Sequence, residues 1–237
     1  MNQKTNSYSN YNPFWNIKYT QILLLFFSFA IITILTTSGS LKNIDNLIFE
    51  YFKNIQRDTQ SDLIVITITT ISDTINLIII GFILAIIKKT RRIGMVFLLS
   101  IIMITILVTY VKPLLASNQI HIIFKPLIEL PKKFSLEKDS FMPFDQNYSY
   151  PSNHLASTTA FSFIIGGIIY KRYPLFAIGF FISFPILIGI TKLYLLQQFF
   201  SDIIAGCILG LMILSLIIKF TKIEEKEIDK IKDKEHI

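Results

Sequence analysis

The sequence has few of the residues that crosslink proteins or bind metals. Its 237 residues include one cysteine, Cys207, and three histidines. A single cysteine forms no intrachain disulfide, which excludes a fold held together by such bonds. We expect no metal site and no cofactor. Residues 1–16 contain no apolar stretch, so we also expect no cleavable secretory signal.

Charged residues are also scarce, at 16% of the chain. Lysine and arginine number 23 against 16 aspartates and glutamates, which gives a formal net charge of +7. A basic balance can indicate nucleic-acid binding, but most of these charges flank apolar runs. We therefore expect no nucleic-acid partner and predict that the chain contacts a lipid bilayer.

Apolar residues are present in excess. They make up 52% of the chain, with a mean hydropathy of +0.55, which is more than one soluble core of this length requires. A membrane-spanning helix needs about 20 apolar residues because its backbone must bond internally. Six stretches meet this need, and the sequence predicts an all-α fold, a six-span transmembrane helical bundle. They are 20–37, 63–87, 93–111, 154–170, 174–190 and 203–218.

The second stretch is ambiguous between strand and helix, and the segment before it is amphipathic. Residues 64–69 are β-branched and resemble a strand locally, but 74–87 alone is too short to span, so we predict one helix over 63–87. Between the first two stretches, apolar residues recur at helical intervals and predict a helix lying in the membrane interface. These residues are Ile44, Leu47, Ile48, Tyr51, Phe52 and Ile55.

Basic residues in short connections predict the orientation in the cell membrane. Lys88, Lys89, Arg91 and Arg92 join the second and third stretches, and residues 171–172 join the fourth and fifth. Both connections, and with them both termini, are predicted to be cytoplasmic. The predicted division is a cytoplasmic segment 1–19, a membrane domain 20–219 with an outer loop 112–151, and a charged cytoplasmic tail 220–237.

Three places on the predicted outer face carry candidate site residues. They are the end of the third stretch, the start of the fourth, and the turn between the fifth and sixth. The residues there are Lys112; Ser152, Asn153 and His154; and Thr191, Lys192, Gln198 and Asp202. Two cations, a helix start rich in donors, a hydroxyl and an acid on one face suit the binding of a phosphate.

Each of these residues also has a structural interpretation. Lys112 and Lys192 can anchor helix ends in the interface by snorkelling. The polar residues before the fourth and sixth stretches can cap helices. His154 is either a candidate acid or base or a structural residue at the membrane interface. Gln198 and Asp202 are four residues apart and share a helix face if the turn is helical.

The three places resemble the motifs of the type 2 phosphatidic acid phosphatases, which include lipid phosphatases and undecaprenyl pyrophosphate phosphatases. Those motifs are Lys, six residues, Arg-Pro; then Pro-Ser-Gly-His; then Ser-Arg, five residues, His, three residues, Asp. The resemblance covers most of the chain and implies six spans. The second motif reads Pro151-Ser152-Asn153-His154, and the third reads Thr191-Lys192, Gln198 and Asp202 with its spacing kept. In the first, Lys112 fits, but Gln119 and Ile120 stand where Arg and Pro are expected.

The resemblance implies roles for these positions. In the family, the third-motif His attacks phosphorus, the Asp orients that His, and the second-motif His protonates the leaving oxygen. Here Gln198 takes the nucleophile's place, and its amide nitrogen is not basic and cannot make that attack. It can still donate an N–H to Asp202. Lys192 and Gln119 replace guanidinium groups that clamp phosphate oxygens with two hydrogen bonds.

The sequence thus predicts an integral membrane protein that acts on or binds a lipid phosphate or pyrophosphate at the outer face. The phosphate-binding positions are Lys112, Ser152, Asn153, Thr191 and Lys192; the positions of the catalytic residues are His154, Asp202 and Gln198. Hydrolysis is left open because the nucleophile is missing. The alternative is a catalytically inactive lipid-phosphate-binding or structural membrane protein. A transporter is disfavoured, since the sequence shows no inverted repeat or pair of broken helices.

A few other features remain open at this stage. Asp73 lies inside the second predicted span, where an acid is either functional or a polar contact between helices, and we leave it unassigned. His121 lies in an apolar stretch of the outer loop and is expected to pack against the bundle. That loop is either a lid over a lipid head group or a solvated connector. Gly206 and Gly210 predict close packing of the last span within the monomer.

Overall fold

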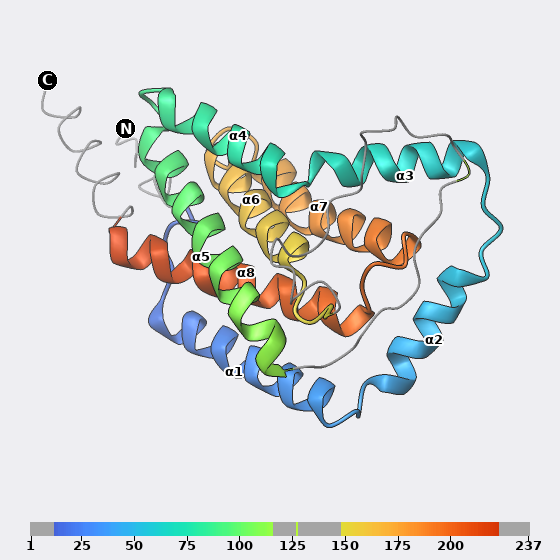
Figure 1. Cartoon of the computed structure of the whole chain (residues 1–237). Helices are drawn as coiled ribbons and strands as arrows, with labels where there is room; N and C mark the ends of the chain where they lie inside the picture. The colour runs from blue at the N-terminus through green and yellow to red at the C-terminus, as the bar shows by residue number, and fades with distance from the viewer. Residues whose placement is uncertain (1–11, 116–126, 128–147, 223–237) are drawn as a thin grey trace, which may run out of the picture.

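A computed structural model describes residues 12–115, 127 and 148–222 of the chain (Figure 1). These residues form helices and no strand, so the predicted all-α fold is confirmed. The helices are α1 (Tyr19–Thr37), α2 (Lys42–Lys53), α3 (Thr59–Ile71), α4 (Thr74–Ile86), α5 (Arg91–Leu115), α6 (Asn153–Ile169), α7 (Pro174–Tyr194) and α8 (Phe200–Thr221).

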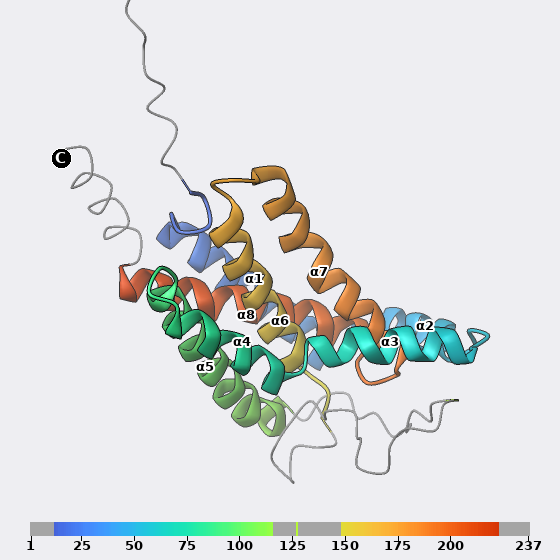
Figure 2. The same ribbon diagram turned by 90° about the horizontal axis from the view of Figure 1, so that it is seen from above.

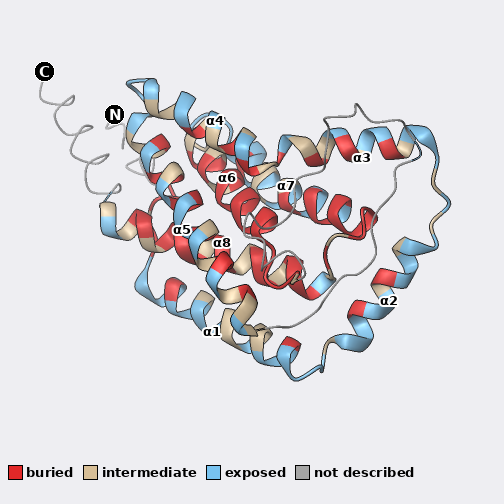
Figure 3. Cartoon of the chain, viewed as in Figure 1, coloured by how far each residue is buried: buried red, intermediate tan, exposed pale blue. Residues whose placement is uncertain are grey.

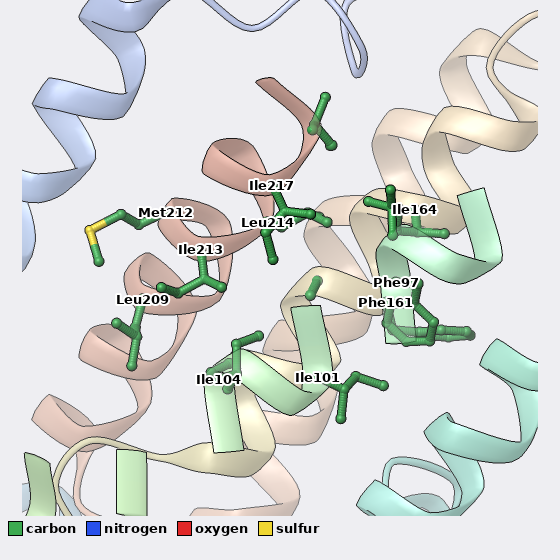
Figure 4. Packing of buried hydrophobic residues seen from close by; sticks show 14 of the residues in the cluster. Phe97, Ile101, Ile104, Phe161, Ile164, Leu209, Met212, Ile213, Leu214 and Ile217 are labelled. Atoms are coloured by element: carbon green, nitrogen blue, oxygen red, sulfur yellow. The ribbon is translucent and has the colours of Figure 1, made fainter. Parts of the chain in front are cut away.

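Helix α6 lies at the centre of the bundle. It packs against α7, α8, α5 and α4, and Figure 2 shows it crossing α8 between α4 and α7. Most of its residues are buried, whereas α1 is largely exposed (Figure 3). The apolar core joins α5, α6 and α8, with Phe97 of α5 near Phe161 of α6 at 5.9 Å between ring centroids (Figure 4). Helix α6 is therefore held on several sides, which fixes the position of its first residues.

Glycines allow α8 to approach α6 closely. A Cβ atom at Gly206 would lie 2.5 Å from the carbonyl oxygen of Ser152, and one at Gly210 would lie 2.2 Å from that of Ala156. Only glycine leaves room for such backbone contact. The close packing predicted for Gly206 and Gly210 thus occurs within the chain.

The long apolar helices support a membrane protein. Four of them, α1, α5, α7 and α8, are long and apolar enough to cross a bilayer, and α3 with α4 would make a fifth span. Helix α6 is apolar but has 17 residues. A multi-pass membrane protein is supported, whereas the predicted count of six spans is not established by the lengths and compositions of the described helices.

The prediction of one continuous helix over 63–87 is wrong. The chain breaks between α3 and α4, and the two helices are bent by 44°. The side chains of Ser72 and Asn76 donate to the carbonyl oxygens of Thr69 and Thr70, at 2.8 and 2.6 Å. These bonds satisfy carbonyls at the end of α3, so the break is tolerated inside an apolar segment.

The predicted interfacial segment is helical, and its apolar side chains divide between the protein and the exterior. Asp45 and Phe49 of α2 are buried, while Leu47 and Tyr51 on the apolar face are 72% and 66% exposed. Phe49 packs against Phe199, with ring centroids 5.1 Å apart. Ile48 and Phe52 pack against the core, so one part of the apolar face contacts the protein and the other part is exposed, as expected of a helix in a membrane interface.

Basic residues gather at one end of the molecule. Lys219 of α8 lies 5.0 Å from the ring centroid of Tyr19 in α1, and Arg92 of α5 donates to the carbonyl oxygen of Thr221. We call this region the basic end; its charged residues are Lys88, Lys89, Arg92, Lys171, Arg172 and Lys219. Figure 1 shows the start of α1 and the end of α8 on this side.

Candidate functional site

The predicted site residues gather at the opposite end of the bundle, which we call the site end. It is formed by the last turns of α5 and α7 and the first turns of α6 and α8 (Figure 2). The candidates there are all buried, with exposed fractions of 2% or less. They are Lys112, Ser152, Asn153, His154, Thr191, Lys192, Gln198 and Asp202.

The starts of α6 and α8 are joined by hydrogen bonds. Ser152 caps α6, because its hydroxyl oxygen accepts from the backbone N–H of Leu155 at 3.3 Å. The backbone N–H of Ser152 donates to the carbonyl oxygen of Asp202 at 3.2 Å. The carboxylate of Asp202 accepts from the backbone N–H of Phe199 at 2.8 Å. Both residues are therefore helix caps, and the caps hold two positive helix ends side by side.

The two lysines of the site end are buried inside the protein. Nζ of Lys112 donates to the carbonyl oxygen of Tyr148 at 3.1 Å, and its charge acts on Asp202. Nζ of Lys192 donates to the side-chain oxygen of Gln197 at 3.0 Å. A snorkelling anchor keeps its ammonium group in water. The exposed fractions of 0% and 1% argue against that interpretation for both lysines.

His154, the second residue of α6, faces an acid from another helix. Its Nε2 atom lies 3.8 Å from Oδ1 of Asp73, at the break between α3 and α4. The histidine side chain is 1% exposed and that of the aspartate 20%. The structure thus brings Asp73, which the sequence left unassigned, to the second-motif histidine.

The turn that carries Gln198 is not helical, which was the condition for Gln198 and Asp202 to share a helix face. Helix α8 begins at Phe200, and Phe199 has an extended backbone. The turn before it is made by Leu196, whose φ of 53° is left-handed. Gln198 therefore does not share a helix face with Asp202, and the hydrogen bond predicted between their side chains does not form in the part of the chain that the structure describes. Oε1 of Gln198 is buried there without a hydrogen-bond partner.

The remaining candidates differ in what they present. Thr191 donates its hydroxyl proton to the carbonyl oxygen of Ile188 at 2.8 Å, one turn earlier in α7. Asn153 is the first residue of α6 and is buried. Gln119, Ile120 and His121 lie outside the described residues, as does most of the loop 112–151 and the tail beyond 222.

Two acids that the sequence analysis did not select hold the neighbouring helices in place. Asp45 of α2 accepts from the backbone N–H and the hydroxyl of Ser201, at 2.9 and 2.6 Å. Asp62 of α3 is fully buried and accepts from Arg57 at 2.9 Å, from the Tyr194 hydroxyl at 2.9 Å and from the backbone N–H of Leu127 at 2.8 Å. Asp45 attaches α2 to the start of α8, and Asp62 attaches α3 to the end of α7. One feature of the sequence could have indicated that Asp45 is buried: Phe49 follows it one helical turn later and lies on the same face of the helix.

The titratable groups just outside the membrane helices reflect this packing. Burial raises the pKa of Tyr150, in the segment leading to α6, to about 12, and its hydroxyl is 2.7 Å from that of Thr33. The carboxylate of Asp62 raises the pKa of Arg57 through a hydrogen bond. Backbone and side-chain hydrogen bonds from Ser61 lower the pKa of Asp58.

Comparisons with known proteins agree with the geometry. No curated protein matches the chain. A crystal structure of a transmembrane PAP2 type phosphatidylglycerolphosphate phosphatase from Bacillus subtilis has a similar fold, with a TM-score of 0.63 and 21% sequence identity over 85% of this chain and 96% of that one. The family model of the PAP2 superfamily matches residues 93–225, which is more than half of the chain and contains all three motif positions. The chain belongs to the PAP2 superfamily.

Proposed function

We propose that this protein binds the phosphate or pyrophosphate group of a lipid at its site end, on the outer face of the cell membrane, without hydrolysing it through a phosphohistidine. The observation that carries the proposal is the burial of two ammonium groups, those of Lys112 and Lys192, beside the first turns of α6 and α8. The similar fold from Bacillus subtilis belongs to a phosphatidylglycerolphosphate phosphatase, and a lipid phosphate is the ligand that membership of the family favours.

The burial of the lysines supports an anionic ligand. Removing an ammonium group from water costs several kcal/mol unless a counter-charge and hydrogen bonds compensate. Neutral oxygens of Tyr148 and Gln197 accept from the two lysines. The carboxylate of Asp202 also interacts with the charge of Lys112. A phosphate has enough acceptor oxygens for both lysines and the helix N–H groups.

The chemistry of the third motif argues against the family's reaction route. Gln198 occupies the position of the attacking histidine, and an amide does not become a phosphorylated intermediate. The extended backbone at Phe199 separates Gln198 from α8. A bound phosphate would therefore lack the nucleophile that the family uses.

The outer-face location is supported by the distribution of basic residues. The connection between α4 and α5 and the one between α6 and α7 carry exposed Lys88, Lys89, Lys171 and Arg172. Short basic connections lie on the cytoplasmic side of membrane proteins. Helix α6 runs from the site end to one of these connections, so the site end would face outward.

Hydrolysis by a modified route is the second candidate. It is favoured by the retention of His154 and Asp202, both buried at the starts of helices. A histidine there can still protonate a leaving oxygen. Water would have to take the place of the missing nucleophile, which predicts slow turnover.

Phosphate release separates the two candidates. Purified protein in lipid nanodiscs is given phosphatidic acid, phosphatidylglycerolphosphate or a polyprenyl pyrophosphate, and released phosphate and bound lipid are both measured. We expect binding without release in the parent, and release after Gln198→His, which restores an imidazole at the nucleophile's position. Gln198→Asn is the matched control and should bind without turnover.

The outcomes differ in what they overturn. Release by the parent protein would contradict the inactive-site proposal and favour the modified route. The proposed function as a whole would be contradicted if the parent bound none of these lipids and Gln198→His released no phosphate. That result would favour a structural role.

A further inference from the structure

The break between α3 and α4 places a carboxylate against the second-motif histidine. Oδ1 of Asp73 lies 3.8 Å from Nε2 of His154. This distance is within the range of an ion pair and longer than a hydrogen bond. Acids inside membrane helices are costly, and where they occur they commonly pair with another group. Asp73 lies outside residues 93–225, so the family's sequence motifs do not include it.

The carboxylate of Asp73 has no role in capping its own helix. Asp73 stands at the N-cap position of α4, yet its side chain accepts no capping hydrogen bond. Asp58 stands at the same position of α3, and its side chain accepts from the backbone N–H of Ser61 at 2.6 Å. The carbonyls at the break are satisfied by Ser72 and Asn76 instead. The local structure therefore leaves Oδ1 of Asp73 directed at His154.

Other charged groups lie at the site end on the helices that pack against α6. Lys112 belongs to α5, Lys192 to α7 and Asp202 to α8. Asp202 is held by Phe199 and Ser149, and Lys112 acts on it. Asp73 is the acid for which the structure gives an ion-pair distance to His154.

We propose that Asp73 is the carboxylate partner of His154: it stabilises the imidazolium form of the histidine and orients its ring at the site end. This role rests on the proposed function, because it concerns the same site. An imidazolium donor strengthens the hold on an anion whether or not turnover follows. Asp73 is thus a positioning residue supplied by the half of the chain that the family model does not match.

The charge state of His154 tests the pair without any lipid. Protein labelled with ¹⁵N and ¹³C at histidine is titrated by NMR, and the His154 signal is identified as the one lost in His154→Gln. We expect a smaller fraction of His154 in the imidazolium form at a given pH in Asp73→Asn, since an opposite charge within a few ångströms favours the protonated form. Asp58→Asn, at the N-cap of α3, should leave that fraction unchanged, and Asp73→Glu should largely restore it.

Two results would overturn the pairing. One is an unchanged imidazolium fraction of His154 in Asp73→Asn; the other is an equal change in Asp58→Asn. If Asp73→Asn does not fold, Asp73→Ser gives the same comparison, because a serine hydroxyl can bond the backbone at the break. Phosphatidic acid binding is measured on the same samples. If Asp73→Asn changes the protonation of His154 but the parent binds no lipid, the proposed function is contradicted and the Asp73–His154 pairing is supported. If the parent binds lipid but the protonation of His154 is unchanged in Asp73→Asn, the pairing is contradicted and the proposed function is supported.

Discussion

The lysines at the two ends of the bundle have opposite environments. At the basic end, Lys88 and Lys89 are exposed, and Lys219 lies over the ring of Tyr19. At the site end, Lys112 and Lys192 are 0% and 1% exposed. All of them lie at or next to the end of an apolar helix, so the sequence pattern around them is the same. The difference shows that the surrounding helix ends, and not the residue type, separate membrane anchors from candidate ligands of an anion.

The largest effect is expected from the buried acid beside the site end. Asp62→Ala would leave Arg57 and Tyr194 without their shared acceptor and should reduce the free energy of unfolding by about 3–5 kcal/mol. Glu50→Ala is the matched control, because it removes an ion pair with Lys53 whose side chains are about half exposed. That change should cost less than about 1 kcal/mol. Denaturant unfolding in detergent measures both, and equal costs would contradict the contrast between buried and exposed charges.

A smaller effect is expected when the buried lysines are made apolar. Lys112→Met and Lys192→Met should each weaken binding of phosphatidic acid at least about tenfold, since a hydrogen bond to a charged group contributes roughly 1.5–3 kcal/mol. Lys89→Met, at the basic end, should change binding less than about twofold because exposed charges are screened. Lipid binding to the purified variants is compared at one salt concentration. A larger loss of phosphatidic acid binding in Lys89→Met than in the other two variants would contradict the proposal that the buried lysines bind the phosphate.

The sequence predicted the elements of this fold well where apolar length decides them. Five of the six apolar stretches correspond to single helices, and the β-branched run 64–69 is helical as expected. The break after Ile71 was missed because it depends on side chains of Ser72 and Asn76 folding back onto carbonyls, a contact that hydropathy does not contain. The helix α2 was predicted, but the contact of its Asp45 with Ser201 was not, since Ser201 is far away in the sequence.

The site was predicted to the extent that its motifs keep their spacing. The second motif places Ser152 at the N-cap of α6 and His154 in its first turn, and Asp202 falls in the first turn of α8. The motif spacing did not reveal that Gln198 lies in an extended turn before α8, because that turn depends on the left-handed residue Leu196. Asp73 was visible as an intramembrane acid, but its partner His154 follows only from the packing of α4 against α6.

The most direct test is to measure which lysines touch the phosphate. Protein with ¹⁵N in its lysine side chains is reconstituted with phosphatidic acid, and ¹⁵N–³¹P dipolar couplings are recorded by solid-state NMR. We expect couplings to two ammonium groups, one lost in Lys112→Met and the other in Lys192→Met, with no release of phosphate. Couplings that survive both changes and vanish in Lys88→Met or Lys89→Met would place the lipid phosphate at the basic end and contradict the account.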